Sequence, residues 1–151
     1  MTAGARSRGF TLIELLLVVA LIAVASGLAT FAIRDPSSTQ LENEAARLVS
    51  LLEAARAQSR ATGMAVRWEP RPAKPDTTGF HFVGLPQGND LPTHWLGEGV
   101  SAEIVGQPAL VLGPEPIIRR QRVVLRLNDQ RLTLATDGLA PFAVVEEEAA
   151  S

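Results

Sequence analysis

Residues 9–33 read GFTLIELLLVVALIAVASGLATFAI, and this stretch decides how the rest of the chain is interpreted. From Phe10 to Ile33 the run is apolar apart from a few isolated positions. As a helix with a rise of about 1.5 Å per residue it would be about 36 Å long, which exceeds a hydrocarbon core of about 30 Å. A core helix is usually shorter and apolar on one side only, and a secretory signal has an apolar region of about 7–15 residues. We therefore expect residues 10–33 to form a transmembrane helix.

The sequence around this run predicts its orientation. Residues 1–9 are short and polar, with Arg6 and Arg8 and no acidic residue. Positive residues favour the cytoplasmic side, so we expect a single pass through a membrane with residues 1–9 on the cytoplasmic side and the rest of the chain outside. Glu14 lies inside the apolar run, where a carboxylate at the bilayer centre costs about 2.5–3.5 kcal/mol, so we expect it to have a partner.

The string Gly9-Phe10-Thr11-Leu12-Ile13-Glu14 resembles the cleavage and N-methylation motif of type IV prepilins and type II secretion pseudopilins. The resemblance implies that residues 1–9 are a leader, that a prepilin peptidase cleaves between Gly9 and Phe10, and that the same enzyme methylates the Phe10 amine. It also implies that Glu14 acts in assembly by pairing with the Phe10 amine of a neighbouring subunit. Major pilins of this family usually carry a helix-breaking proline in this helix. None occurs between Phe10 and Ile33, which favours a minor component.

A second helix is predicted over residues 34–62. Asp35-Pro36 should interrupt the first helix, and Thr39 to Glu42 form a capping-box pattern that predicts a restart. The apolar residues then recur at helical spacing: Leu41, Ala45, Leu48, Leu52 and Ala55. The charged residues Glu42, Glu44, Arg47, Glu53, Arg56 and Arg60 are interpreted as a solvated face with local ion pairs. Gly63 is a natural stop.

Residues 63–151 predict a β-rich head in the periplasm. Seven short segments have strand character: 64–69, 80–85, 100–105, 109–112, 121–127, 130–135 and 141–146, with loops over 70–78 and 86–92. The clearest hairpin turns at Asn128-Asp129. Its expected register pairs Val123 with Leu134, Leu125 with Leu132, and Arg126 with Arg131, because a slip by one residue would mix the two faces.

The predicted fold class is α+β, with a long N-terminal helix packed on an antiparallel β-rich head, and it resembles the lollipop architecture of pilins. Residues 134–145, with an Asp137-Gly138 turn and Pro141-Phe142, resemble the end of GspH-type minor pseudopilins and, more loosely, FimT-like minor pilins. The resemblance implies a minor pseudopilin of the type II secretion system, located in the pseudopilus tip after assembly. Its implied partners are other minor pseudopilins, the major pseudopilin, the prepilin peptidase and the inner membrane.

Little in the sequence suggests catalysis. The chain has no cysteine and no recognisable nucleophile, zincin, phosphate-loop or dinucleotide motif. His81 and His94 are interpreted as ordinary positions, and Trp68 and Trp95 as core or loop anchors. We therefore expect no enzymatic activity, no cofactor and no metal site. A membrane-anchored periplasmic enzyme remains a third functional class without a recognisable site.

One basic cluster suggests a contact surface. It comprises Arg119, Arg120, Arg122, Arg126 and Arg131. Like charges opposite each other on a hairpin repel, so an acidic partner would stabilise them. Three interpretations stay open: side chains splayed into solvent, an acidic neighbouring protein, or DNA, as in FimT-like minor type IV pilins of natural transformation. The balance of 14 Lys and Arg against 16 Asp and Glu disfavours a wholly basic nucleic-acid coat.

Overall fold

The computed structural model describes residues 10–31, 35–71, 79–88 and 90–145, and the chain divides into two compact units at Asp35 and Pro36. Each unit is therefore described by itself. The expected leader, most of the expected loop over 70–78, and the acidic residues Glu146 to Glu148 lie outside the described residues.

The first unit contains helix α1, Leu12–Phe31. Phe10 and Thr11 precede the helix, so Phe10 does not form part of it as the sequence had suggested. The carbonyl of Thr11 accepts hydrogen bonds from the amides of Glu14 (3.1 Å) and Leu15 (3.2 Å), which places Thr11 at the start of the helix. In the described part of the chain, no helix is both long enough and apolar enough to cross a membrane. Residues 32 and 33 of the expected span lie outside that part.

Helix α2, Pro36–Thr62, opens the second unit. It begins at Pro36, three residues before the expected capping box at Thr39. Proline is well suited to a first helical position, because its fixed φ matches the helix and its missing N–H would have no partner there. The helix ends where expected, and Gly63 follows with a φ of 68°.

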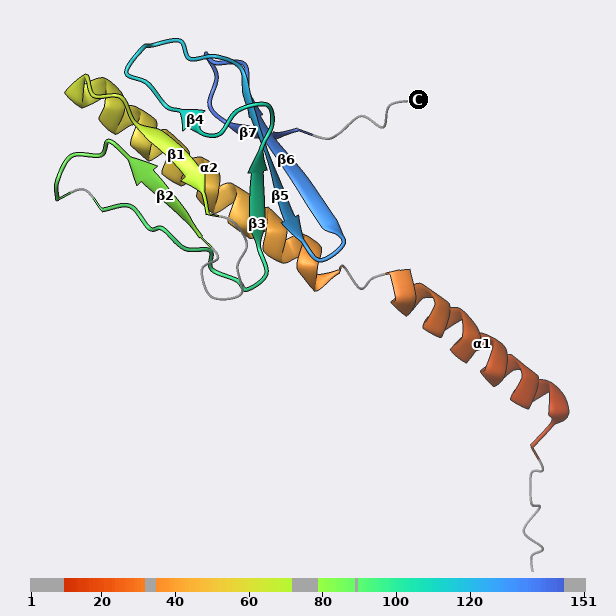
Figure 1. Ribbon diagram of the computed structural model, residues 1–151. Coiled ribbons are helices and arrows are strands. Elements are labelled where there is room, and N and C mark those ends of the chain that lie inside the picture. Colours follow the sequence, from red (N-terminus) through yellow and green to blue (C-terminus); the bar gives the residue numbers. More distant parts are fainter. Residues whose placement is uncertain (1–9, 32–34, 72–78, 89, 146–151) are drawn as a thin grey trace, which may run out of the picture. The chain divides into compact units, whose positions relative to one another are not determined.

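In the described residues seven strands follow, one in each segment where the sequence predicts a strand. They are β1 Arg67–Pro70, β2 Phe80–Val83, β3 Ser101–Ile104, β4 Leu110–Val111, β5 Gln121–Leu127, β6 Gln130–Thr136 and β7 Ala143–Val145. They form two antiparallel sheets, with strand orders β2-β1-β4 and β3-β5-β6-β7 (Figure 1). The register of the β5-β6 hairpin is confirmed, with Val123 opposite Leu134, Leu125 opposite Leu132, and Arg126 opposite Arg131.

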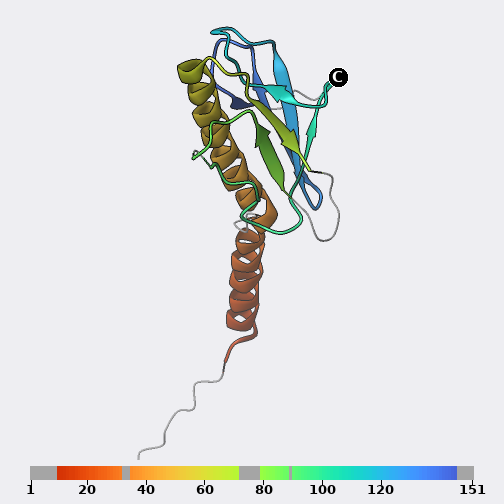
Figure 2. The same cartoon turned by 60° about the vertical axis from the view of Figure 1, so that its left-hand side comes forward.

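Helix α2 runs along one side of the strands and packs on β5 and β6 (Figure 2). All five apolar residues predicted for its inner face are buried. Trp68 and Trp95 are both core residues, and Phe80 lies between them, with ring centroids 5.7 Å from Trp68 and 4.7 Å from Trp95. The second unit therefore has one hydrophobic core between helix and sheets, and the α+β fold class is confirmed.

The solvated face expected for α2 is wrong at two positions. Glu44 and Arg56 are each only 1% exposed. Steps of three from Leu41 and four from Leu52 place these residues on the apolar face of the helix. Neighbouring loops supply hydrogen-bond partners to Glu44 Oε1 and to both terminal nitrogens of Arg56, which offsets part of the cost of burial.

Candidate functional site

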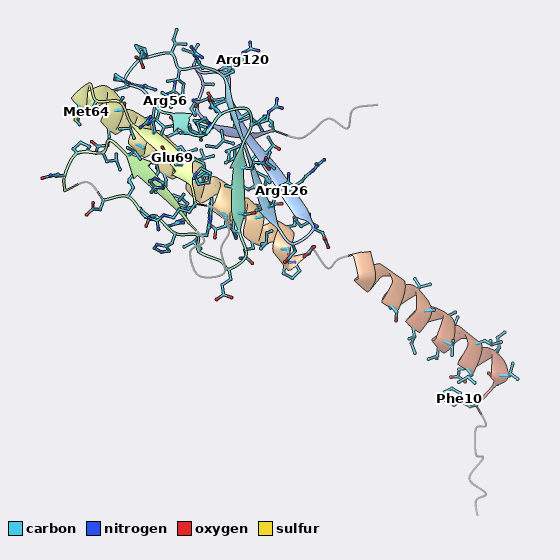
Figure 3. The ribbon with its side chains drawn as sticks, in the orientation of Figure 1. Phe10, Arg56, Met64, Glu69, Arg120 and Arg126 are labelled. Carbon is cyan, nitrogen blue, oxygen red and sulfur yellow. The ribbon has the colours of Figure 1, made fainter. Side chains whose placement is uncertain are left out.

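The N-terminal segment carries the residues expected to act in processing and assembly. Gly9 lies outside the described residues, whereas Phe10 is described, precedes α1 and is 75% exposed (Figure 3). Glu14 lies in the first turn of α1, where the helix dipole favours a negative charge. Large apolar side chains are exposed along the helix: Leu12, Ile13, Leu15, Leu16, Leu17, Val18, Val19, Leu21, Ile22 and Val24. Exposed apolar side chains at consecutive positions leave this part of the helix without a distinct polar face.

Arg56 connects α2 to two loops of the head. Its Nη2 donates to the carbonyl oxygens of Gly138 (2.7 Å), Leu139 (3.4 Å) and Pro116 (3.4 Å), and its Nη1 donates to Ala140 O (3.2 Å). The guanidinium has a fixed set of donors and no acceptor, so one side chain can satisfy several carbonyl groups that face it. This buried arginine therefore holds the loop over 138–140 and the loop at Pro116 against the helix.

Glu44 and Glu53 provide matching acceptors on the same helix. Glu44 Oε1 accepts from the amide of Gly97 (2.8 Å), and Glu53 Oε1 accepts from the amide of Phe142 (3.2 Å). The distance from Glu53 Oε1 to Arg56 Nη1 is 3.8 Å. These contacts give α2 a second role beside core formation, which is to position loops.

The expected turn at Asp137-Gly138 is confirmed. Asp137 Oδ1 accepts hydrogen bonds from the amides of Ala140 (2.8 Å) and Leu139 (2.9 Å), and Gly138 has a φ of 100°. These two amides, first that of Ala140 and then that of Leu139, lower the pKa of the Asp137 carboxyl below its usual value, and the charge of Arg120 adds to the effect. A Cβ at Gly138 would lie 1.9 Å from the carbonyl oxygen of Ile118, so the turn packs against the segment that leads to Arg119.

The structure divides the five arginines into two groups. Arg126 and Arg131 lie opposite each other near the hairpin turn. Strand β3 pairs with β5 on the edge opposite to β6. Arg126 Nη2 lies 3.6 Å from Glu103 Oε2 on β3. The chain thus supplies an acidic residue for this end of the cluster, a contact that the hairpin alone did not reveal.

The second group surrounds a hollow at the other end of β5. Arg119, Arg120 and Arg122 line it together with residues of the β3-β4 connection and of β6, and its volume is about 430 Å³. Arg120 is separated from Arg126 in Figure 3. Among the described residues, neither Arg119 nor Arg122 forms an ion pair.

The two histidines lie apart from these groups. His81 is on β2 opposite Glu69, with 3.2 Å between Nε2 and Oε2. His94 is exposed, and its carbonyl oxygen accepts a hydrogen bond from Arg47 (2.9 Å). The described residues contain no group of three or more His, Cys, Asp or Glu side chains arranged to hold a metal ion.

Comparison with known proteins supports the interpretation of the N-terminal segment. Residues 4–30 match the family model described as the prokaryotic N-terminal methylation motif. Comparisons with curated proteins and with solved structures found no match. The motif supports a type IV pilin-like protein, a class that includes pilus and pseudopilus components and is structural rather than catalytic.

Proposed function

We infer that the chain is a minor pseudopilin of the type II secretion system, which assembles in the tip of the pseudopilus. The observation that carries the proposal is the methylation motif over residues 4–30, which includes most of the apolar helix α1 with Glu14 in its first turn. The resemblance of residues 134–145 to GspH-type proteins selects this member of the class. Other minor pseudopilins and the major pseudopilin are then its neighbours.

In this proposal the motif defines the processing step. A prepilin peptidase removes residues 1–9 and methylates the new Phe10 amine. Before assembly, residues 10–33 anchor the protein in the inner membrane with the head in the periplasm. During assembly α1 exchanges lipid for the apolar helices of neighbouring subunits, and Glu14 pairs with a neighbour's Phe10 amine, because an uncompensated carboxylate in such surroundings is costly.

Intact-mass analysis of protein extracted from cells that contain the peptidase tests the proposal. We expect the mass of a chain that begins at methylated Phe10. G9V should retain the leader, because a larger side chain obstructs the scissile bond, whereas the control G4V should be processed normally. Wild-type protein that retains Met1 in these cells would contradict the proposal.

The second candidate is a FimT-like minor type IV pilin that binds DNA. The observation in its favour is the hollow lined by Arg119, Arg120 and Arg122. Phosphate contacts release counterions, so DNA affinity would fall steeply with salt. A mobility-shift titration at two salt concentrations, beside co-purification with pseudopilins, separates the two candidates. Tight, salt-sensitive DNA binding without recovery of pseudopilins would favour the second.

A further inference from the structure

Two hollows adjoin each other at the end of the head where β4 and the start of β5 meet. The hollow of about 430 Å³ is basic, as described above. A second, of about 300 Å³, is lined by Val111, Glu115, Ile117 and Ile118. Both include Gln107, Arg119 and Gln121, so they form one groove with a basic half and an apolar half.

The apolar half exposes aliphatic side chains to solvent. Ile117 is 66% exposed and Val111 is 42% exposed. Single exposed aliphatic residues are common on protein surfaces, but here they lie in a hollow next to three arginines. A ligand that fills the whole groove must therefore combine an apolar group with negative charge.

The floor of the groove is held by hydrogen bonds of its own. Gln121 is 4% exposed; its Oε1 accepts from the amide of Val111 (2.6 Å) and from Gln107 Nε2 (2.9 Å), and its Nε2 donates to Val111 O (2.8 Å). The backbone of β4 is thus occupied at Val111 and does not offer a free edge for an added strand there. Recognition in the groove must come from side chains.

The rim is also positioned before any ligand arrives. Arg56 binds the carbonyl of Pro116, next to Ile117, and the amide of Ile118 donates to Gly138 O (3.1 Å). The segment that carries Ile117, Arg119 and Arg120 is therefore held by the core helix. A preformed site loses less conformational entropy when it binds.

We propose that this groove docks a segment of a neighbouring protein subunit in which an aliphatic side chain lies beside two or more carboxylates. The aliphatic group packs on Ile117 and Val111, and the carboxylates accept hydrogen bonds from Arg119 and Arg122. The inference rests on the assembly role proposed above and names the chemistry of one contact in that assembly.

The surroundings favour an acidic protein segment over DNA. Beside Val111, Ile117 and Ile118, the second hollow holds one cation, Arg119, and one carboxylate, Glu115, whereas DNA binding relies on extended basic surfaces. Residues 35–151 contain 15 Asp and Glu against 11 Lys and Arg, and Arg126 is already paired with Glu103. The basic area available to a duplex is therefore small.

Fluorescence anisotropy with the full-length, detergent-solubilised protein tests the proposal. The probe is a labelled peptide in which one leucine precedes three glutamates. One control peptide replaces the glutamates with glutamines and another replaces the leucine with serine. A labelled DNA duplex of about one helical turn is the competing ligand. We expect the first peptide to bind most tightly and both control peptides to bind more weakly.

Two double variants remove equal charge from the two arginine groups. R119Q/R122Q should weaken peptide binding by about tenfold or more, because it removes both charge-assisted contacts. R126Q/R131Q should change it by less than about twofold, since those residues lie outside the groove and act only through screened charge. I117S should weaken binding of the leucine peptide but leave the serine peptide unaffected. Arg120 is not substituted, because its charge helps to lower the pKa of Asp137.

The proposal would be overturned by the absence of peptide binding, by equal losses in the two double variants, or by tighter binding of the duplex than of the peptide. Leader cleavage and methylation, measured for R119Q/R122Q and for wild type, test the assembly role separately from the groove. A variant that is cleaved and methylated normally but has wild-type peptide affinity refutes the groove and leaves the assembly role standing. Wild-type protein that is not processed refutes the assembly role instead.

Discussion

At the residue scale, Arg56 determines how the loops of the head meet α2. Its guanidinium is buried and donates to four carbonyl groups. R56M keeps most of the side-chain volume but removes the guanidinium donor from all four carbonyl groups, of which only Gly138 O and Ala140 O keep another donor among the described residues, and it leaves Glu53 without its cationic neighbour. We expect the free energy of unfolding of the head to fall by about 3–5 kcal/mol.

Urea unfolding of the full-length protein, followed by tryptophan fluorescence, measures this loss, because Trp68 and Trp95 are both in the head core. R60M is the matched control, since Arg60 is exposed on the same helix one turn later. The control should change stability by less than about 0.5 kcal/mol. Equal effects of the two substitutions would show that the contacts of Arg56 with the loops do not stabilise the head.

Asp137 gives the head a predictable response to acid. Hydrogen bonds from the amides of Ala140 and Leu139 hold its pKa below the usual value, so the folded state favours the carboxylate. The ionised Asp137 carboxylate therefore stabilises the folded head. This stabilisation is fully present above the unfolded-state pKa, and it is lost as the pH falls through the lower folded-state pKa. D137N should therefore be less stable than wild type near neutral pH, and the difference should shrink below about pH 4. Unfolding curves at several pH values measure it, and a difference that is constant with pH would contradict the prediction.

At the scale of elements, Gln121 joins the two sheets. It stands at the start of β5 in one sheet, and its amide occupies both backbone groups of Val111 in β4 of the other. Q121L keeps a similar volume but leaves the partly buried N–H and C=O of Val111 without this partner. We expect a loss of about 2–3 kcal/mol in the free energy of unfolding, together with faster hydrogen exchange at the Val111 amide.

The matched control for this prediction is Q87L, because Gln87 is exposed in a turn and belongs to neither sheet. It should leave stability and the exchange rate of Val111 unchanged. If Q121L unfolds like wild type, or if Val111 stays equally protected, the connection between the sheets does not depend on this side chain.

At the scale of the whole molecule, the first unit is expected to control assembly and the second to control stability. The entire described core belongs to residues 36–151, whereas Glu14 belongs to α1. E14A should therefore leave head unfolding unchanged but reduce co-purification with partner subunits several-fold, because the pairing with a neighbour's Phe10 amine is lost. The control E42A removes an exposed glutamate from α2 and should assemble normally. Undiminished recovery of partners with E14A would contradict the assembly role of Glu14.

The sequence by itself determined the local structure of the chain. The spacing of Leu41, Ala45, Leu48, Leu52 and Ala55 predicted which face of α2 is buried. The alternation of apolar and polar residues on either side of a two-residue turn predicted the register of the β5-β6 hairpin. These predictions succeed because helical periodicity, strand alternation and turn chemistry act over a few residues. The motif around Gly9, Phe10 and Glu14 was likewise visible, because it is contiguous.

Only the tertiary structure determined which residues from distant segments of the chain contact each other. The pairing of β3 with β5 brings Glu103 to Arg126, and the packing of two loops on α2 turns Arg56 from an expected surface residue into a buried one. The tertiary structure likewise divides the arginines into a group near Glu103 and a group that lines the groove. Helical stepping placed Arg56 and Glu44 on the inner face, but their partners Gly138 and Gly97 are 82 and 53 residues away in the chain. Such contacts depend on the arrangement of the complete fold, which local sequence patterns do not encode.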